Sequence, residues 1–465
     1  MKLVFSLKVV YTSCGSSVFL EALPLEPARS YHLARKVLFH LRTRLTHISE
    51  RSSLCGNVLR EMACFIASRS ERIPMKIAHI APPWLALPPK DYGGTETMLY
   101  HLVEEQVAQG HDVTVLAPGD ARTSAQLVSF FPRSLIATGV PWQGHLKAYY
   151  HLSKSVEYIK HHDFDVVHTH LSSSADMYLF PLMASLATPH VMTLHSRFPF
   201  DRVQSWAGDA DEYYMEWASS VPMVVISEQV RAQRTPSLTI VDVVHHGVPM
   251  AHYQPTVKLS EPFFVWLGRF TPEKGPHLAI EASKKAGVPL VLAGTVDRHL
   301  QESVAYFEQE IQPHLDHEQI TYIGPVDMKQ KVDVLSRARG LLNPIQWEEP
   351  FGMVMIEAMA VGCPVIAFDR GAASEIVAHR KSGFLVEGVN EMVQCIGRIN
   401  EIDRVAVRAH VEQHFTAHAM TEKYTRVYKK IIASSRGKHA FGRSSSQVAP
   451  LALTFVKTNE SLLMP

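Results

Sequence analysis

The segment "EEPFGMVMIEAMAVGCPVIAFDRGAASEIV" (residues 348–377) carries most of what the chain reveals about its fold and chemistry. It holds two carboxylates, Glu349 and Glu357, with seven residues between them. Glu349 stands beside Pro350 and Gly352, where chains turn, and Glu357 lies in a run of good helix formers. The apolar run "PVIAF" that follows is typical of a buried strand. The segment therefore predicts a loop, a helix and a strand, with one acid at the helix start and one inside the helix.

The same alternation of strand, loop and helix runs through both halves of the chain. Continuous apolar runs ending in polar or glycine-bearing loops are typical of parallel strands buried on both faces. Those of the first half are "KIAHIAP", "DVTVLAPG", "FDVVHTH", "HVMTLHS", "MVVISE" and "TIVDVVHHGVP". Those of the second half are "FFVWLG", "LVLAG", "ITYIG", "GLLNP" and "PVIAF". The sequence predicts an α/β protein with two doubly wound, Rossmann-like domains facing a central cleft, and ligands at the carboxyl ends of the strands.

The helices that belong to this pattern follow from the spacing of apolar residues. They are predicted over residues 95–110, 276–285, 329–337, 353–361 and 405–432. We place one domain over residues 75–255 and a second over 256–404. The helix over 405–432 could cross back to the first domain, and residues 433–465 are predicted to be a disordered tail.

Residues 1–74 differ in composition from the rest. They hold 11 Lys and Arg against 5 Glu and no Asp, and they show no sustained helical or strand periodicity. An acid-poor leader rich in Arg and Ser could be a transit peptide. We favour a mis-assigned start, because "MKIAHIAPP" from Met75 reads as a natural first strand. These residues are left out of the fold prediction.

Charge and cysteine usage limit the class of protein. The formal net charge is +1, which gives no electrostatic reason to expect a nucleic acid partner. The 5 cysteines form no CxxC pair or metal-ligand spacing, which favours a reducing, cytoplasmic compartment. No apolar run approaches the roughly 20 residues that a membrane span needs.

Two cations follow the first strand of the second half, in "GRFTPEKG". Arg269 offers a forked guanidinium and Lys274 a mobile ammonium, which together suit a pyrophosphate. The alternative is that both are ordinary solvated charges. Gly268 and Gly275 flank the pair and would allow a close backbone approach.

The acid pair has a similar chemical interpretation. Unpaired N–H groups at the predicted helix start, residues 351–353, can donate to phosphate or hydroxyl oxygens. Glu349 at the helix mouth can accept hydrogen bonds from sugar hydroxyls, and Glu357 can reach a ribose. The alternatives are favourable placement of Glu349 near the helix dipole and a solvated helix face for Glu357.

Together, "GRFTPEKGPHLAIEA", residues 348–377 and "SGFLVEG" closely resemble glycosyltransferase family 4, a retaining family with the GT-B fold. The resemblance covers nearly all of the chain from Met75 to about residue 432. The acid pair spaced E-x7-E is the hallmark of that family. The resemblance identifies residues 75–255 as the acceptor side and residues 256–404 as the nucleotide-sugar domain.

The resemblance also implies roles for residues of the second half. Arg269 and Lys274 match the basic pair that holds the donor diphosphate and stabilises it as a leaving group. Glu349 matches the acid that contacts donor-sugar hydroxyls. Glu357 matches the acid that binds the nucleoside ribose, and Glu375 stands where the family often has an acid near the donor.

Further donor contacts are implied on both halves. The amides of Phe351, Gly352 and Met353 match those that assist the acid at the helix mouth. In the first half, "DYGGTE" looks like the family's glycine loop, which would bring Gly93 and Gly94 near the donor. His195 aligns with a histidine that faces the transferred sugar. The implied catalytic set is Glu349, His195, Arg269 and Lys274.

The resemblance implies transfer of a sugar from a nucleoside-diphosphate donor to an acceptor hydroxyl with retention of configuration. No cofactor or metal is expected, since cations and helix N-termini can stabilise the departing diphosphate. The "DADE" string at Asp209–Glu212 is read as surface. The acceptor could be a glycan, a lipid or a small molecule.

Some features depart from the family or leave alternatives open. His246 replaces the customary Asn of the inter-domain loop. His168 and His170 in "HTH" could be part of a metal site, but without an evident third ligand we read them as a polar strand end on the acceptor side. Residues 129–154 mix aromatic and basic side chains. They could touch a membrane, although a packed connector and helix is the preferred interpretation.

Other functions were weighed against transfer. A nucleotide-sugar epimerase or hydrolase with the same fold is one alternative, and a non-catalytic sugar-nucleotide-binding protein is another. A dinucleotide-dependent oxidoreductase would need a GxGxxG turn after a strand, which the chain lacks.

Overall fold

The computed structural model describes residues 3–12, 15–24, 74–90, 93–142, 144–171, 178–196, 209–233, 238–255, 261–298 and 300–441. The chain divides into two compact units, Met1–Ile73 and Pro74–Pro465. In the first unit, β1 (Leu3–Thr12) and β2 (Gly15–Pro24) form an antiparallel hairpin. No regular element was predicted there, although "LVFSLKVVYT" is rich in the β-branched and aromatic residues that favour strands.

The second unit begins with a seven-stranded parallel sheet of order β5-β4-β3-β6-β7-β8-β9. The first strand of this half lies at the centre beside the fourth, which is the doubly wound arrangement. The strands are β3 (Lys76–Ile80), β4 (Asp112–Leu116), β5 (Gln126–Val128), β6 (Val166–Leu171), β7 (His190–Leu194), β8 (Met223–Val225) and β9 (Ile240–Val243). Of these, β5 was not predicted.

A six-stranded parallel sheet of order β12-β11-β10-β13-β14-β15 follows. It repeats the arrangement of the first sheet, with β10 next to β13 at the centre. The strands are β10 (Phe264–Arg269), β11 (Leu290–Thr295), β12 (Ile320–Tyr322), β13 (Leu341–Asn343), β14 (Val365–Phe368) and β15 (Gly383–Val386). The last of these was not predicted as a strand.

Helices connect the strands in both sheets. Those of the first half are α3 (Gly94–Ala108), α4 (His145–Lys160), α5 (Leu179–Ala184), α6 (Asp209–Ser220) and α7 (Glu228–Ala232). Those of the second half include α8 (Pro276–Ala286), α9 (Gln301–Tyr306), α10 (Met328–Arg337), α11 (Met353–Ala360), α12 (Ala373–Ile376) and α13 (Val389–Arg398). The "DADE" residues open α6, and the placement of their side chains lies outside the described part.

The C-terminal helix was predicted as one element, and the structure has two, α14 (Arg404–His414) and α15 (Ala417–Phe441). The break lies at Phe415 and Thr416. Thr416 forms a β-bridge with Val248, and its hydroxyl accepts from the Ala419 amide at 3.0 Å, so it starts a new helix. Helix α15 also extends past residue 432, into the segment predicted to be disordered.

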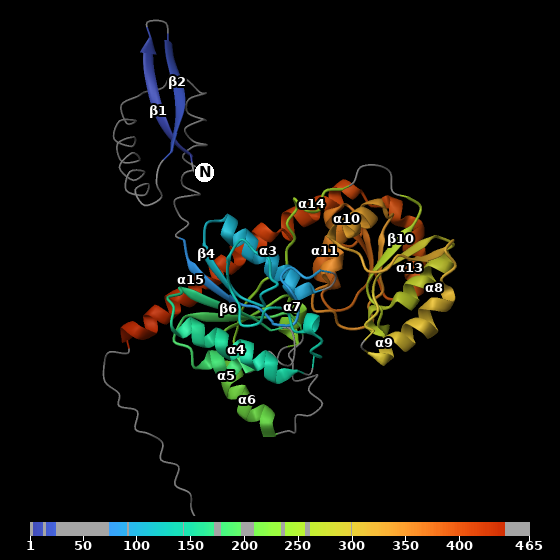
Figure 1. Ribbon diagram of the computed structural model, residues 1–465. Helices are drawn as coiled ribbons and strands as arrows, with labels where there is room; N and C mark the ends of the chain where they lie inside the picture. The colour runs from blue at the N-terminus through green and yellow to red at the C-terminus, as the bar shows by residue number, and fades with distance from the viewer. Residues whose placement is uncertain are drawn as a thin grey trace, which may run out of the picture. The chain divides into compact units, whose positions relative to one another are not determined.

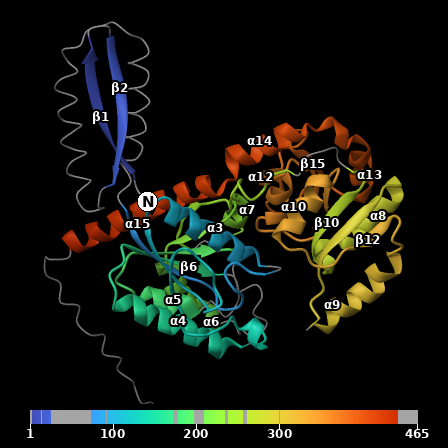
Figure 2. The same cartoon turned by 45° about the horizontal axis from the view of Figure 1, so that its top comes forward.

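Helix α15 packs against the N-terminal sheet (Figure 1, Figure 2). It contacts α3, β6 and β7, and its buried face forms one apolar cluster with the central strands. The members from α15 are Met420, Tyr424, Val427 and Tyr428. The end of the chain thus completes the core of the first domain. Among the described residues, no helix combines the length and apolarity needed to cross a bilayer.

Candidate active site

The loops after β10 and β13 bring the first two predicted site residues together. Because these strands are neighbours in a parallel sheet, their carboxyl ends open at the same edge. Lys274 ends a short 3-10 turn, Pro272–Lys274, and its Nζ donates to Glu349 Oε2. The indole Nε1 of Trp347 donates to the same oxygen at 2.8 Å.

This trio is held tightly. The side chains of Lys274 and Glu349 are only 15% and 14% exposed, so their ion pair is screened far less than a surface pair. The ammonium also lies 5.3 Å from the centre of the Trp347 ring, within cation–π range. Sequence reasoning missed Trp347, although it lies two residues before the acid that it orients.

Arg269, the other predicted cation, is the last residue of β10 and is exposed. Its positive charge, with that of Lys274, acts on the carboxyl of Glu273. Burial alone would raise the pKa of that carboxyl. Hydrogen bonds from its own amide and from Thr271, together with the two cations, outweigh burial and hold the pKa below its usual value. The Glu273 carboxylate is therefore ionised and offsets part of the positive charge of the two cations at the sheet edge.

Helix α11 begins beside Glu349, as the acid pattern predicted. Gly352 is the N-cap, with φ 92, and a Cβ there would lie 2.6 Å from Met355 Cε. The left-handed backbone favours glycine here, whereas the flexible end of the Met355 side chain could move aside. Met353 opens the helix and is half-buried. The Phe351 side chain is buried, and its ring lies 4.9 Å from that of His246.

Glu357 lies on the inner side of α11, so the alternative of a solvated helix face is wrong. The residue is 4% exposed, and its Oε1 accepts from Tyr253 Oη at 2.9 Å and from Lys331 Nζ at 2.5 Å. Burial and the nearby carboxylate raise the pKa of Tyr253 well above its usual value. Lys331 comes from α10 and was not predicted as part of the site.

Glu375 links the two sheets. Its carboxylate accepts from the amides of Glu228 and Gln229, the first residues of α7, at 2.8 Å each. It also lies 2.9 Å from His245 Nε2. Burial alone would raise the pKa of Glu375, but these hydrogen bonds hold it below the usual value. In the structure the Glu375 carboxylate therefore caps the N-terminus of α7 (Glu228–Ala232).

The glycine loop reaches α3 from its N-terminal side. Gly93 is the N-cap with φ 158, and a Cβ there would lie 2.9 Å from Glu96 Oε2. Gly94 is the first helical residue, and a Cβ would meet nothing within 4 Å. The preceding Asp91 and Tyr92 lie outside the described residues.

His195, just beyond β7, belongs to a buried chain of imidazoles. Its Nε2 lies 3.0 Å from His170 Nδ1, and its Nδ1 lies 3.5 Å from His246 Nε2. Burial lowers the pKa of His195 to about 3, so the ring is neutral at ordinary pH. Through His246 and Phe351 this chain reaches the loop that carries Glu349.

The reading of "HTH" as a polar edge on the acceptor side is wrong, because His168 and His170 are fully buried. They share one sheet face with His79, which pairs with His168 across β3 and β6. Sequence reasoning missed His79, but the doubly wound strand order alone would have placed its strand beside "VVHTH".

The three imidazoles of His79, His168 and His170 lie close enough to share a metal ion. Each ring nitrogen, however, already has a protein partner. His168, for example, lies 2.7 Å from both Tyr428 Oη and Thr193 Oγ1. The remaining partners are Gln106, His195 and the other imidazoles of the trio. The arrangement fits a hydrogen-bonded network better than a ligand set.

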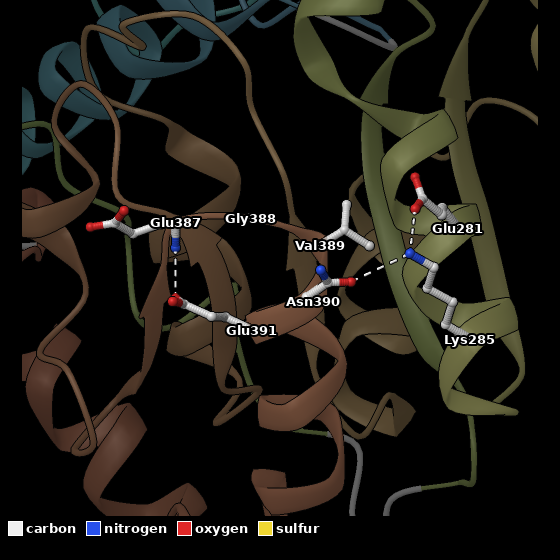
Figure 3. A pocket seen from close by; sticks show the side chains of 7 residues that line it. All are labelled: Glu281, Lys285, Glu387, Gly388, Val389, Asn390 and Glu391. Carbon is white, nitrogen blue, oxygen red and sulfur yellow. Dashed lines mark hydrogen bonds and ion pairs between the residues drawn. The ribbon is translucent and has the colours of Figure 1, made fainter.

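A surface depression between α8 and α13 lies apart from these residues. Figure 3 shows Lys285 between Glu281 and Asn390, at 2.8 Å and 3.4 Å, and Glu391 accepting from the Glu387 amide at 2.9 Å. None of the predicted site residues lines it. Its polar groups contact one another, so it provides a control position for the experiments below.

Solved glycosyltransferase structures have the same arrangement of two sheets. Sucrose-phosphate synthase from Thermosynechococcus elongatus superposes with a TM-score of 0.61 at 22% identity, covering 77% of this chain and all of that one. Anabaena Alr3699/HepE in complex with UDP and glucose gives 0.57 at 18% identity, covering 76% and 99%. The fold is therefore GT-B, as predicted.

Family comparisons then identify the class of enzyme. Residues 251–402 match the model "Glycosyl transferases group 1", and residues 92–252 match "Glycosyltransferase Family 4". The chain belongs to this family of glycosyltransferases. Relatives include O-antigen chain mannosyltransferase C of Escherichia coli, 24% identical over 77% of this chain and all of its own length. The D-inositol 3-phosphate glycosyltransferase of Jonesia denitrificans is 23% identical over 80% and 99%.

Proposed function

We propose that the protein transfers a hexose from a nucleoside-diphosphate sugar to an acceptor hydroxyl, with retention of configuration and without a metal ion. The observation that carries the proposal is the pairing of Lys274 with Glu349 at the start of α11 (Met353–Ala360). A cation for the leaving diphosphate and an acid for sugar hydroxyls already stand side by side.

The chemistry follows from these positions. Lys274 and Arg269 bind the donor phosphates. Glu349, released from its ion pair with Lys274, then accepts hydrogen bonds from the sugar. The bond between the anomeric carbon and the phosphate oxygen breaks, and a bond to the acceptor oxygen forms on the same face. The acceptor proton passes to the departing phosphate, whose negative charge the two cations stabilise. No protein nucleophile is needed.

Known proteins support the substrate class. Alr3699/HepE has been solved with UDP-glucose, and the E. coli relative is a mannosyltransferase. The first name gives a nucleotide-linked hexose and the second a hexose, and together they support a nucleotide-linked hexose as the donor of the present chain. The acceptor class, a glycan, a lipid or a small molecule, stays open.

The test is release of free nucleoside diphosphate from a panel of nucleoside-diphosphate sugars, with and without EDTA. We expect slow release from one donor, unchanged by the chelator. The variants Lys274→Ala and Glu349→Ala should lose it, while Lys285→Ala in the remote depression should keep it. Release that requires a divalent ion would overturn metal independence.

The alternatives predict different outcomes in the same assay. A nucleotide-sugar epimerase would convert the donor sugar without releasing the nucleotide. A non-catalytic binding protein would be stabilised thermally by a nucleotide and release nothing. If no nucleotide stabilises the protein and no donor is turned over, the proposed function is wrong.

We also propose that the protein, in a reducing cytoplasmic compartment, touches a membrane peripherally through α4 (His145–Lys160). One face of this helix is packed, as preferred from the sequence, but Leu146 is 81% exposed and Tyr149 and Tyr150 are also exposed. Trp142 precedes them, and Lys147 is exposed beside them. Aromatic and basic side chains together suit an anionic bilayer surface.

Sedimentation with vesicles of phosphatidylcholine and phosphatidylserine tests this contact. We expect binding that grows with the phosphatidylserine fraction and falls at high salt. It should be weakened in Leu146→Ser. Equal recovery in the supernatant for all vesicles would contradict it.

A further inference from the structure

A continuous line of buried hydrogen bonds runs from α3 to His195. Gln106 Oε1 lies 2.8 Å from His79 Nε2, and His79 Nδ1 lies 3.1 Å from His170 Nε2. His170 Nδ1 lies 3.0 Å from His195 Nε2. All members except His195 are fully buried, and His195 is 9% exposed. The line starts in the core and ends at the edge where the site lies.

The direction of this line is set by the Gln106 amide. Its oxygen faces His79 and can only accept, so His79 Nε2 carries the proton and Nδ1 is bare. The same reasoning then passes along the line, because a neutral imidazole that accepts at one nitrogen must donate from the other. His170 and His195 both become Nε2–H tautomers. His195 therefore presents a bare Nδ1.

Helix α15 supplies the hydrogen-bond partner at the other end of that amide. The Gln106 Nε2 group donates to Tyr428 Oη at 3.1 Å. Tyr428 Oη in turn lies 2.7 Å from His168 Nδ1, to which it can donate. A rotated amide would reverse the direction of every bond in the line. When the single hydroxyl proton of Tyr428 goes to His168 Nδ1, the hydroxyl can only accept from Gln106, and the amide keeps the orientation that places the proton on His195 Nε2.

We propose that Gln106 and Tyr428 are positioning residues, which hold His195 as its Nε2–H tautomer so that its bare Nδ1 accepts a hydrogen bond from a hydroxyl of the donor sugar. The role of His195 rests on the proposed function, whereas the tautomer does not. In the ligand-free protein Nδ1 faces His246 Nε2 at 3.5 Å, a long contact that a hydroxyl can replace.

Two observations at the end of the line agree with this. Burial keeps His195 neutral, with its pKa lowered to about 3, so the tautomer rather than the charge decides what the ring offers. Beyond it, His246 Nδ1 is buried with no partner among the described atoms, and the His246 ring packs edge-on against Phe351. At the donor loop the line therefore ends in His246 Nδ1, a bare nitrogen that can accept a further hydrogen bond.

The first test is the tautomer itself, in the full-length protein labelled with 15N-histidine. Long-range proton–nitrogen spectra distinguish a protonated from a bare ring nitrogen, and loss of signals in His195→Gln assigns the residue. We expect a protonated Nε2 and a bare Nδ1. The reverse tautomer in the wild type would overturn the proposal without any further variant.

The second test removes the Gln106 amide, which sets the direction of the hydrogen bonds along the line. In Gln106→Leu both tautomers should be populated, and Tyr428→Phe should give a smaller change of the same kind. Tyr424→Phe is the matched control, because its hydroxyl lies 3.0 Å from Thr193 Oγ1 on the His168 branch and not on the line to His195. It should leave the tautomer unchanged. An unchanged tautomer in Gln106→Leu contradicts the proposal.

Ligand affinities of these variants then distinguish a positioning role from general structural damage. The dissociation constant of the nucleotide-sugar donor should rise by the reciprocal of the Nε2–H fraction that remains, about twofold for equal populations. That of the free nucleoside diphosphate should stay constant, because it lacks the sugar. A parallel rise for both ligands would mean structural damage and overturn the proposal. If no nucleotide sugar binds, the proposed function fails while the tautomer result stands.

Discussion

The two halves of the second unit share one strand order but bury different polar groups. The N-terminal sheet holds neutral imidazoles, joined in a line from His79 to His195. The C-terminal half holds ion pairs, Lys274 with Glu349 and Lys331 with Glu357. Neutral groups in a line can set the direction of hydrogen bonds, whereas ion pairs supply charge that a diphosphate can take over. The same scaffold thus serves orientation on one side and electrostatics on the other.

The largest expected effect is acid unfolding of the imidazole-bearing half. Burial lowers the pKa of His79 from 6.5 to about 4, so the unfolded chain binds the proton first as the pH falls. Its stabilising contribution is complete above pH 6.5 and is reduced by about 3 kcal/mol at pH 4. The same direction holds for His101, His151, His168, His170, His195 and His246.

Thermal unfolding followed by circular dichroism between pH 7 and pH 4 measures this. The midpoint should fall steeply below pH 6.5. The variant His151→Gln, which can still donate to the Ala81 carbonyl, should show a shallower fall of the midpoint than the wild type. A flat midpoint between pH 7 and pH 5 would contradict the description of these rings as buried neutral bases.

Replacement of the ion-paired side chains in the other half should act on turnover. Lys274→Ala removes one cation from the leaving diphosphate, and we expect kcat for nucleotide release to fall by about 10²- to 10³-fold. Glu349→Gln should lower kcat through the sugar instead, and leave the affinity for free nucleoside diphosphate unchanged. Equal losses of nucleotide affinity in both variants would contradict the assignment of Lys274 to the diphosphate and Glu349 to the sugar.

The second ion pair should matter more for folding. Lys331→Met leaves the buried Glu357 carboxylate with Tyr253 as its donor among the described residues, and we expect about 3 kcal/mol of destabilisation in urea unfolding. Adding Glu357→Gln should recover part of the loss, because the uncompensated charge is gone. Additive losses in the double variant would mean that the pair is not coupled.

The smallest effect is expected at Glu375, where the two halves meet. Glu375→Gln keeps the shape but loses the charge that faces the α7 amides and His245, and should cost about 1 kcal/mol of stability. Donor affinity should be unchanged if the residue acts as a helix cap. A tenfold weaker affinity for the donor would support the role near the donor that the family resemblance implies.

The fold was readable because its strands are continuous apolar runs, such as "KIAHIAP" and "FFVWLG", each followed by a loop with turn residues. The meeting of Lys274 and Glu349 was also predictable, since both follow central strands of one sheet. The partners of Glu357 were not. Lys331 lies on an amphipathic helix whose sequence gives no reason to turn a lysine inward, and only tertiary packing brings it there.

The N-terminal core shows the same limit of local patterns. His79 reads as one polar residue in an apolar strand, and its partners come from α3, β6 and, through Gln106, the distant Tyr428. The break at Phe415 and Thr416 was missed because helix-forming residues continue on both sides. The bridge to Val248 that interrupts them is a long-range contact.

The position of α15 (Ala417–Phe441) has a consequence for biosynthesis. A domain normally folds once its own residues have left the ribosome, N-terminal domain first. Here Tyr424, Val427 and Tyr428 of α15 pack against the apolar sheet face that includes Met75, Ile77 and Val166. The core of the first domain is therefore complete only after α15 has been synthesised. During synthesis of the C-terminal half, that sheet face has α3 beside it but lacks the cover of α15. Apolar surface left open in this way favours aggregation of the nascent chain until α15 has been made.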